Sequence, residues 1–233
     1  MKHYMPQHTM PVDHTPPIDD DQEETFPAPL PESVAARKRP KPGERRIQIL
    51  QTLAAMLEQP AGERITTAAL AAQLQVSEAA LYRHFASKAQ MFEGLIEFIE
   101  QSVFTLTNQI VERERGQDAA VGTRQSARII AMLVQFAEKN PGMARVMVGD
   151  ALVFENERLQ QRMNQLFDKI DATLKQCLRA SAAPASPTPT ADAQVRASVL
   201  TAFVVGRLQR FVRSGFKRLP SEHLDASLAT ILG

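Results

Sequence analysis

Apolar residues spaced three and four positions apart restrict the fold of this chain more than any other feature. For about 25 residues after Ser87, apolar side chains such as Phe92, Ile96, Ile99 and Val103 recur at this spacing, which puts them on one face of an α-helix. The second half of the chain has the same spacing, and no segment alternates apolar and polar residues between hairpin turns. We therefore predict an all-α fold of about nine helices.

Residues that can cap a helix mark where these elements begin. Thr66, Ser77 and Ser87 can each accept a hydrogen bond from a first-turn amide, and Asn140 followed by Pro141 starts another helix. Asp192 is the expected cap of the eighth helix. The third helix is expected to end near Phe85, and Ser221 is expected to open the ninth. The expected apolar stripes are Ile47, Leu50, Ala54 and Leu57 in the first helix and Val195, Val199, Ala202, Phe203, Gly206 and Phe211 in the eighth.

The first 42 residues have a different composition from the rest. They hold nine prolines and an acidic run over 19–24, without apolar periodicity, so we predict a disordered acidic, proline-rich tail. Residues 37–46 then carry six basic side chains. We interpret this stretch as a flexible arm on DNA phosphates or in the minor groove; the alternative is a solvated linker. Residues 1–36 hold one basic and seven acidic side chains, so the net charge of +1 hides a basic remainder.

Several classes of protein are excluded by what the chain lacks. A single cysteine, Cys177, can form neither an internal disulfide nor, without other cysteines, a zinc site. No apolar run is long enough to span a membrane, and the N-terminus lacks the pattern of a signal peptide. We expect a cytoplasmic protein without a metal, a cofactor or a membrane partner. No catalytic constellation or glycine-rich phosphate loop is present, so an enzyme is not expected.

Two short helices separated by a tight turn at Gln75–Val76 indicate a helix-turn-helix at about 66–85. Leu81 and Phe85 share a face and should anchor the second helix in the core. The remaining side chains are then free to face DNA, with small residues near base edges and hydroxyls near phosphates. The alternative for Tyr82 and His84 is packing against the first and fourth helices. The predicted DNA-binding residues are Thr66, Thr67, Ser77, Glu78, Ala79, Ala80, Tyr82, Arg83, His84 and Lys88.

The sequence from Arg64 to Lys88, with Ser77-Glu-Ala-Ala-Leu-Tyr-Arg-His-Phe85 at its centre, resembles the DNA-binding domain of the TetR family. That resemblance implies an all-helical homodimer with a DNA-binding domain at 43–103 and a helical dimerisation and partner-binding domain at 104–233. Within the second domain, the three prolines of 181–191 predict a surface loop. Residues 95–100, 140–142, 164–167 and 210–214 further resemble the nucleoid occlusion branch of that family. This implies binding to palindromic chromosomal sites and, in the DNA-bound state, antagonism of polymers of the division protein FtsZ. The partner residues it implies, in a groove between the fourth and fifth helices, are Phe98, Met132, Lys139 and Asn140. The alternative for these four is that they are ordinary core or surface positions.

The eighth helix carries more apolar residues than one core-facing stripe needs, so part of it is predicted to meet a twofold mate. The alternative is a helix buried within one monomer. A dimer would place two reading helices about 34 to 36 Å apart and would require an inverted-repeat site. The predicted interface residues are Phe203, Val204, Gly206, Leu208 and Phe211.

A ligand-responsive transcriptional repressor is the alternative function. It requires an apolar pocket with a few convergent polar groups. The C-terminal helices place few polar residues on their inner faces, so a small-molecule ligand is not expected.

Overall fold

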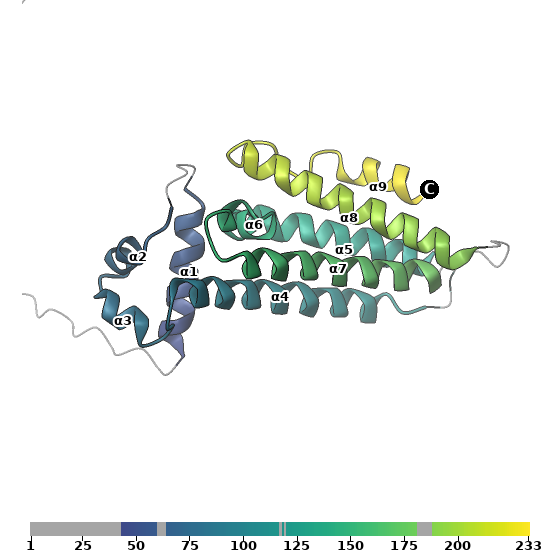
Figure 1. The fold of residues 1–233 in the computed structure, drawn as a ribbon. Helices are drawn as coiled ribbons and strands as arrows, with labels where there is room; N and C mark the ends of the chain where they lie inside the picture. Colours follow the sequence, from purple (N-terminus) through teal and green to yellow (C-terminus); the bar gives the residue numbers. More distant parts are fainter. Residues whose placement is uncertain (1–42, 60–63, 117, 119, 181–187) are drawn as a thin grey trace, which may run out of the picture. The chain divides into compact units, whose positions relative to one another are not determined.

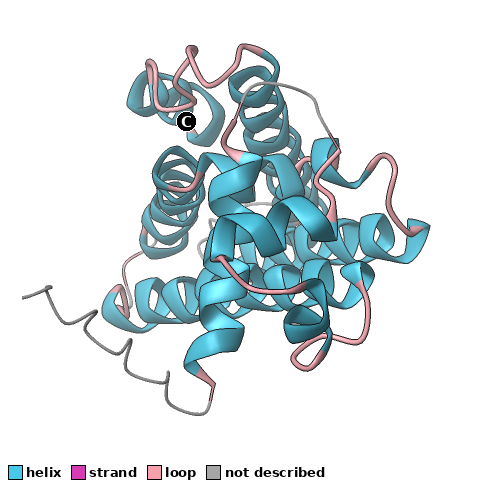
Figure 2. Ribbon diagram, turned by 90° about the vertical axis from the view of Figure 1, so that its left-hand side faces the viewer, coloured by secondary structure: helices cyan, strands magenta, loops and turns pink. Residues whose placement is uncertain are grey.

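A computed structural model describes residues 43–59, 64–116, 118, 120–180 and 188–233 (Figure 1). All regular elements among these residues are helices, as predicted (Figure 2). None of these helices is long and apolar enough to cross a membrane. The predicted tail at 1–42 lies outside the described residues. The elements are α1 (Glu44–Leu57), α2 (Thr67–Leu74), α3 (Glu78–Tyr82), α4 (Lys88–Arg113), α5 (Val121–Lys139), α6 (Pro141–Met147), the 3₁₀ helix η1 (Asp150–Leu152), α7 (Glu157–Ala180), α8 (Pro189–Arg213) and α9 (Leu224–Leu232).

Helices α1, α2 and α3 lie beside the N-terminal end of α4 (Figure 1). Helix α1 buries Ile49, Leu53 and Leu57, a face that repeats every four residues. The predicted stripe was therefore partly wrong, because Ile47 is 55% exposed. The reason is tertiary: α1 contacts α2, α4 and α6, and only the face of Ile49 and Leu53 is covered by this packing.

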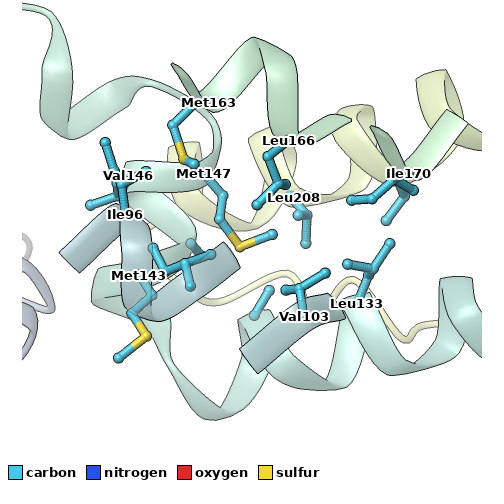
Figure 3. Packing of buried hydrophobic residues seen from close by; sticks show 14 of the residues in the cluster. Ile96, Val103, Leu133, Met143, Val146, Met147, Met163, Leu166, Ile170 and Leu208 are labelled. Carbon is cyan, nitrogen blue, oxygen red and sulfur yellow. The ribbon is translucent and has the colours of Figure 1, made fainter. Parts of the chain in front are cut away.

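The rest of α4 packs with α5, α7 and α8 around an apolar core. Figure 3 shows side chains from these helices and from α6 converging, with Val103, Leu133 and Leu208 all fully buried. Burial of apolar area at this scale provides most of the favourable free energy of folding. Two hydroxyls in this core, Thr107 Oγ1 and Ser126 Oγ, have no hydrogen-bond partner among the described residues.

Helix α6 joins the two groups of helices by a close contact with α1. A Cβ built on Gly142 would lie 2.0 Å from the carbonyl oxygen of Ala54, so only glycine permits this approach. Nearby, Arg145 Nη1 donates hydrogen bonds to the carbonyl oxygens of Leu57 (3.1 Å) and Gln59 (3.4 Å). These bonds satisfy acceptors at the end of α1 that have no partner within the helix.

Three predicted boundaries differ from the structure. Helix α8 begins at Pro189 with Thr188 as its N-cap, so Asp192 lies inside the helix and not at its cap. Proline at a first helical position loses no hydrogen bond, which explains the earlier start. The predicted loop 181–191 therefore overlaps α8 at its end, and residues 181–187 lie outside the described residues. Helix α3 ends at Tyr82 and not Phe85, and α9 begins at Leu224.

Candidate nucleic-acid interface

The turn between α2 and α3 is built from local hydrogen bonds. Thr66 Oγ1 accepts the amide of Ala69 (3.1 Å), and Ser77 Oγ accepts that of Ala80 (3.3 Å), as the predicted N-caps require. Between them, Gln75 adopts a left-handed conformation (φ 54°), which lets Val76 N donate to Ala71 O at the end of α2. This capped turn holds the two short helices at a defined angle to each other.

Two buried side chains anchor α3 from the inside. Leu81 and Phe85 are each 1% exposed, as the sequence predicted. Arg46 of α1 lies over the Phe85 ring, 4.1 Å from its centroid, and its Nη1 donates to His84 O (3.1 Å). Sequence reasoning assigned Arg46 only to a basic arm, and no local signal indicated this contact across 38 residues. Arg46 holds the C-terminal end of α3 against α1.

With Leu81 and Phe85 inside, the predicted reading residues of α3 lie outside. Among them Ala80 is half-buried and the others are exposed: Ser77, Glu78, Ala79, Tyr82, Arg83 and His84. The alternative for Tyr82 and His84 was packing against α1 and α4. The structure does not have this packing, since Tyr82 is 45% exposed and His84 is also exposed. Side chains no larger than a methyl group at 79 and 80 allow close approach of the helix to base edges.

A hydrogen-bond chain joins α2 to α3 on this surface. Thr67 Oγ1 donates to Glu78 Oε2 (2.6 Å), and Tyr82 Oη donates to Thr67 Oγ1 (3.5 Å). Sequence analysis placed all three residues at the interface but did not predict that they bond to one another. Because these groups satisfy each other in the DNA-free protein, a phosphate would have to compete with Glu78 for Thr67. Thr66 is exposed at the N-terminus of α2, where first-turn amides point outward.

Lys88 stands at the first turn of α4 and is engaged elsewhere. Its Nζ lies 2.5 Å from Oε1 of Glu155, and Arg64 Nε lies 3.7 Å from the same oxygen. The Glu155 side chain is 8% exposed. Arg64 Nη2 also donates to Phe154 O (3.3 Å). The segment before α7 thus contacts the chain on both sides of the helix-turn-helix, at Arg64 and at Lys88. Lys88 can reach a phosphate only by leaving this ion pair.

The predicted partner residues lie on α4 and α5, which pack against each other. Phe98 is 46% exposed, Lys139 is exposed and Met132 is half-buried. Asn140 caps α6 by its backbone, while its Nδ2 donates to Phe136 O (2.8 Å). A second exposed apolar residue, Leu106, lies two turns along α4 from Phe98. Its spacing placed it in the apolar stripe of α4, and it was not among the predicted partner residues.

The predicted dimer residues divide between the inside and outside of the protomer. Val204 and Leu208 are fully buried and Phe211 is 2% exposed, because they face the core of their own chain. These three assignments are therefore corrected. Phe203 and Gly206 are half-exposed, and a Cβ on Gly206 would meet nothing within 4 Å. They lie beside the exposed Val195 and Val199, so the predicted stripe of α8 is largely its outer face.

Two family descriptions match the chain. Residues 49–95 match the family described as bacterial regulatory proteins, tetR family. Residues 123–231 match the SlmA-like family described as the tetracyclin repressor-like C-terminal domain. Together these matches cover the helix-turn-helix and most of the helical bundle.

Curated relatives extend the similarity along most of the chain. The protein named nucleoid occlusion factor SlmA of Idiomarina loihiensis is 50% identical over 182 residues, covering 78% of this chain and 90% of that protein. The protein of the same name from Alteromonas mediterranea is 47% identical over 189 residues, covering 81% and 94%.

Solved structures agree in fold at much lower identity. The regulator FadR of Bacillus subtilis, in complex with stearoyl-CoA, has a TM-score of 0.62 at 13% identity, over 80% of this chain and 97% of that one. FadR of Bacillus halodurans has a TM-score of 0.64 at 12% identity, over 83% and 97%. Identity this low shows a shared fold alone.

Proposed function

This chain belongs to the SlmA family of TetR-type regulators, and from that premise we propose that it is a DNA-binding nucleoid occlusion factor. The observation that carries the proposal is identity near one half that continues through the C-terminal domain. In the proposed function, the protein binds palindromic chromosomal sites on the nucleoid. In that DNA-bound state it antagonises assembly of FtsZ polymers, which blocks septum formation over the chromosome.

The outer surface of α3 supports sequence-specific DNA binding. Its small residues Ala79 and Ala80 let the helix enter a major groove, while Tyr82 and Arg83 extend toward phosphates or base edges. Rigid anchoring by Leu81 and Phe85 from the inside keeps this surface fixed relative to α4. We assign the reading of bases to α3 and the first phosphate contact to the N-terminus of α2 at Thr66.

The outer face of α8 supports a homodimer. Val195 is 63% exposed and Val199 is 46% exposed, and both lie on one stripe with Ala202 and Gly206. Exposed apolar stripes of this kind mark contacts with another protein chain. A second copy placed on the same stripe by a twofold axis would bury it in both protomers. Val199→Asp should give monomers in analytical ultracentrifugation, while the same substitution at Val153, which is 68% exposed and lies outside this stripe, should not.

We assign the FtsZ contact to the α4–α5 surface around Phe98. An aromatic side chain this exposed on a long helix has no role in the protomer core, and the cation of Lys139 can attract an acidic segment. Phe154→Ala is the matched control for Phe98→Ala, because both remove an exposed phenyl ring.

The deciding experiment is pelleting of FtsZ polymers with this protein, with and without a duplex that carries a site obtained by in vitro selection. Antagonism that strengthens with the selected duplex, and that Phe98→Ala weakens while Phe154→Ala does not, is the expected result. An unchanged polymer in both conditions would overturn the FtsZ assignment and leave a DNA-binding regulator.

One observation favours the second candidate, a ligand-responsive repressor. The hydroxyls of Thr107 and Ser126 lie buried in the apolar core without a partner among the described residues. Buried polar atoms without partners cost free energy that a bound ligand could recover. Stearoyl-CoA, the ligand of the Bacillus subtilis structure, is the probe. A ligand-dependent rise in melting temperature together with release of DNA would support this function, and no shift would count against it.

A further inference from the structure

Four basic side chains gather at the C-terminal end of α8 and in the turn that follows. Arg210, Arg213, Lys217 and Arg218 are all exposed, and together with Ser214 they line one shallow hollow. Nine consecutive residues thus present four cations to solvent on one small surface, which we call the basic turn.

The backbone beneath these cations is held in place. Ser214 Oγ accepts the amides of both Lys217 (3.1 Å) and Arg218 (2.9 Å), and it donates to Phe211 O (2.8 Å). Phe216 adopts a left-handed conformation (φ 64°), and its ring contacts that of Phe211 at 5.2 Å between centroids. The turn therefore presents its cations from a defined surface, which lowers the entropy cost of binding an anion.

No acid in the described part of the chain neutralises the basic turn by an ion pair. Other cations of the bundle are paired: Arg162 contacts Glu100 (2.6 Å), and Arg124 contacts Asp118 (2.6 Å). Asp150 lines a second, neighbouring hollow that also includes Arg213, but its carboxylate is bound by Arg145 (2.6 Å). The positive potential of the basic turn is therefore directed to solvent.

The basic turn lies at the end of the bundle that carries the helix-turn-helix. Arg213 lines a hollow together with Val153, and the next residue, Phe154, accepts a hydrogen bond from Arg64, two residues before the cap of α2. Helix α8 also contacts α6, which contacts α1. In Figure 1 the C-terminal end of α8 lies above α6, at the end of the bundle where α1 to α3 are found.

We propose that the basic turn is a second DNA contact, which binds phosphates of the same duplex that α3 reads. The inference rests on the proposed DNA binding and extends it to the C-terminal domain. Arginine and lysine side chains on one rigid turn suit phosphate oxygens, and they carry no base information. The basic turn therefore raises affinity for every duplex, and α3 selects the sequence.

The test compares two triple variants with equal loss of charge. Arg213→Gln, Lys217→Gln and Arg218→Gln neutralise the basic turn. Arg113→Gln, Arg115→Gln and Arg179→Gln remove three exposed cations at the opposite end of the bundle. Affinity is measured over a range of NaCl concentrations for a duplex with the selected site and for an unrelated duplex of equal length, and far-UV circular dichroism checks that both variants are folded.

Loss of each phosphate contact should reduce the slope of log affinity against log salt by about 0.9 on both duplexes. With one contact per protomer of a dimer, the basic-turn variant should lose about 2 from this slope, and the ratio of specific to unrelated affinity should stay unchanged. The control should keep the wild-type slope. A wild-type slope in the basic-turn variant, or an equal loss in the control, would overturn the inference.

Two further results separate this inference from its premise. A wild-type protein that binds neither duplex would overturn both the proposed function and the second contact. If the basic-turn variant keeps its DNA affinity but loses binding to phosphatidylglycerol vesicles, the surface binds lipid phosphate and the DNA assignment is overturned.

Discussion

Gly142→Ala tests how closely α6 and α1 must approach. The added Cβ would lie 2.0 Å from Ala54 O and 3.1 Å from Leu57 Cβ, whereas ordinary contacts begin at 3.4 Å. The two helices would have to separate by about 1.4 Å, the difference between 3.4 and 2.0 Å. Separation would also stretch the hydrogen bonds that Arg145 donates to the end of α1.

The loss of unfolding free energy depends on which atom the new Cβ meets, here the backbone carbonyl oxygen of Ala54. Overpacking costs about 1 to 3 kcal/mol, and we expect the upper end because a helix carbonyl cannot rotate away as a side chain can. Alanine recovers up to about 1 kcal/mol through its higher helix propensity. The net loss of unfolding free energy should be about 2 kcal/mol, or roughly 30-fold in the folding equilibrium.

Urea denaturation followed by far-UV circular dichroism, at fixed protein concentration, measures this loss. Gly206→Ala makes the same chemical change in α8, where nothing lies within 4 Å of the new Cβ in the protomer. Because Gly206 lies on the proposed dimer stripe, both glycine variants are measured in the monomeric Val199→Asp background, where Gly206→Ala should not lower the free energy of unfolding. A Gly142→Ala protein as stable as the wild type would refute the reasoning, as would an equal loss in Gly206→Ala.

Three further predictions concern buried groups. Phe85→Ala should lower the free energy of unfolding by about 3 to 5 kcal/mol, because the ring is 1% exposed; an unchanged urea midpoint would contradict this. Glu155→Gln should raise DNA affinity roughly fivefold, since an ion pair worth about 1 kcal/mol no longer holds Lys88; unchanged or weaker binding in fluorescence anisotropy would count against it. Burial raises the pKa of the Cys177 thiol, so it should stay protonated at neutral pH and resist iodoacetamide until urea unfolds the protein; rapid alkylation of the folded protein would be the opposite result.

Local signals in the sequence predicted the helix-turn-helix well. Thr66, Ser77 and Ser87 each cap the helix that follows, because a hydroxyl and an amide three residues later need no distant partner. Leu81 and Phe85 were also predicted correctly as buried anchors, although α3 ends at Tyr82 and Phe85 lies just beyond it. Once these two residues were assigned to the inside, the exposed residues around α3 followed.

Contacts between distant segments were beyond sequence reasoning. The pairing of Lys88 with Glu155 spans 67 residues, and that of Arg46 with His84 spans 38. In neither pair do the neighbouring residues in the sequence indicate which distant residue is the partner. The four cations of the basic turn were visible in the sequence, but their place near the helix-turn-helix depends on how α8 packs against α6.

Helix α8 shows which of its properties the sequence determines and which the tertiary structure determines. The sequence by itself determined that this segment is a helix with apolar residues on more than one side, because helix periodicity is a property of neighbouring residues. Only the tertiary structure decided that Val204 and Leu208 face the core while Val195 and Val199 face solvent. Both faces of α8 are apolar enough to be buried. Which face is buried depends on which one fits the surface of α7 and α5. That fit is a matter of packing between segments far apart in the chain.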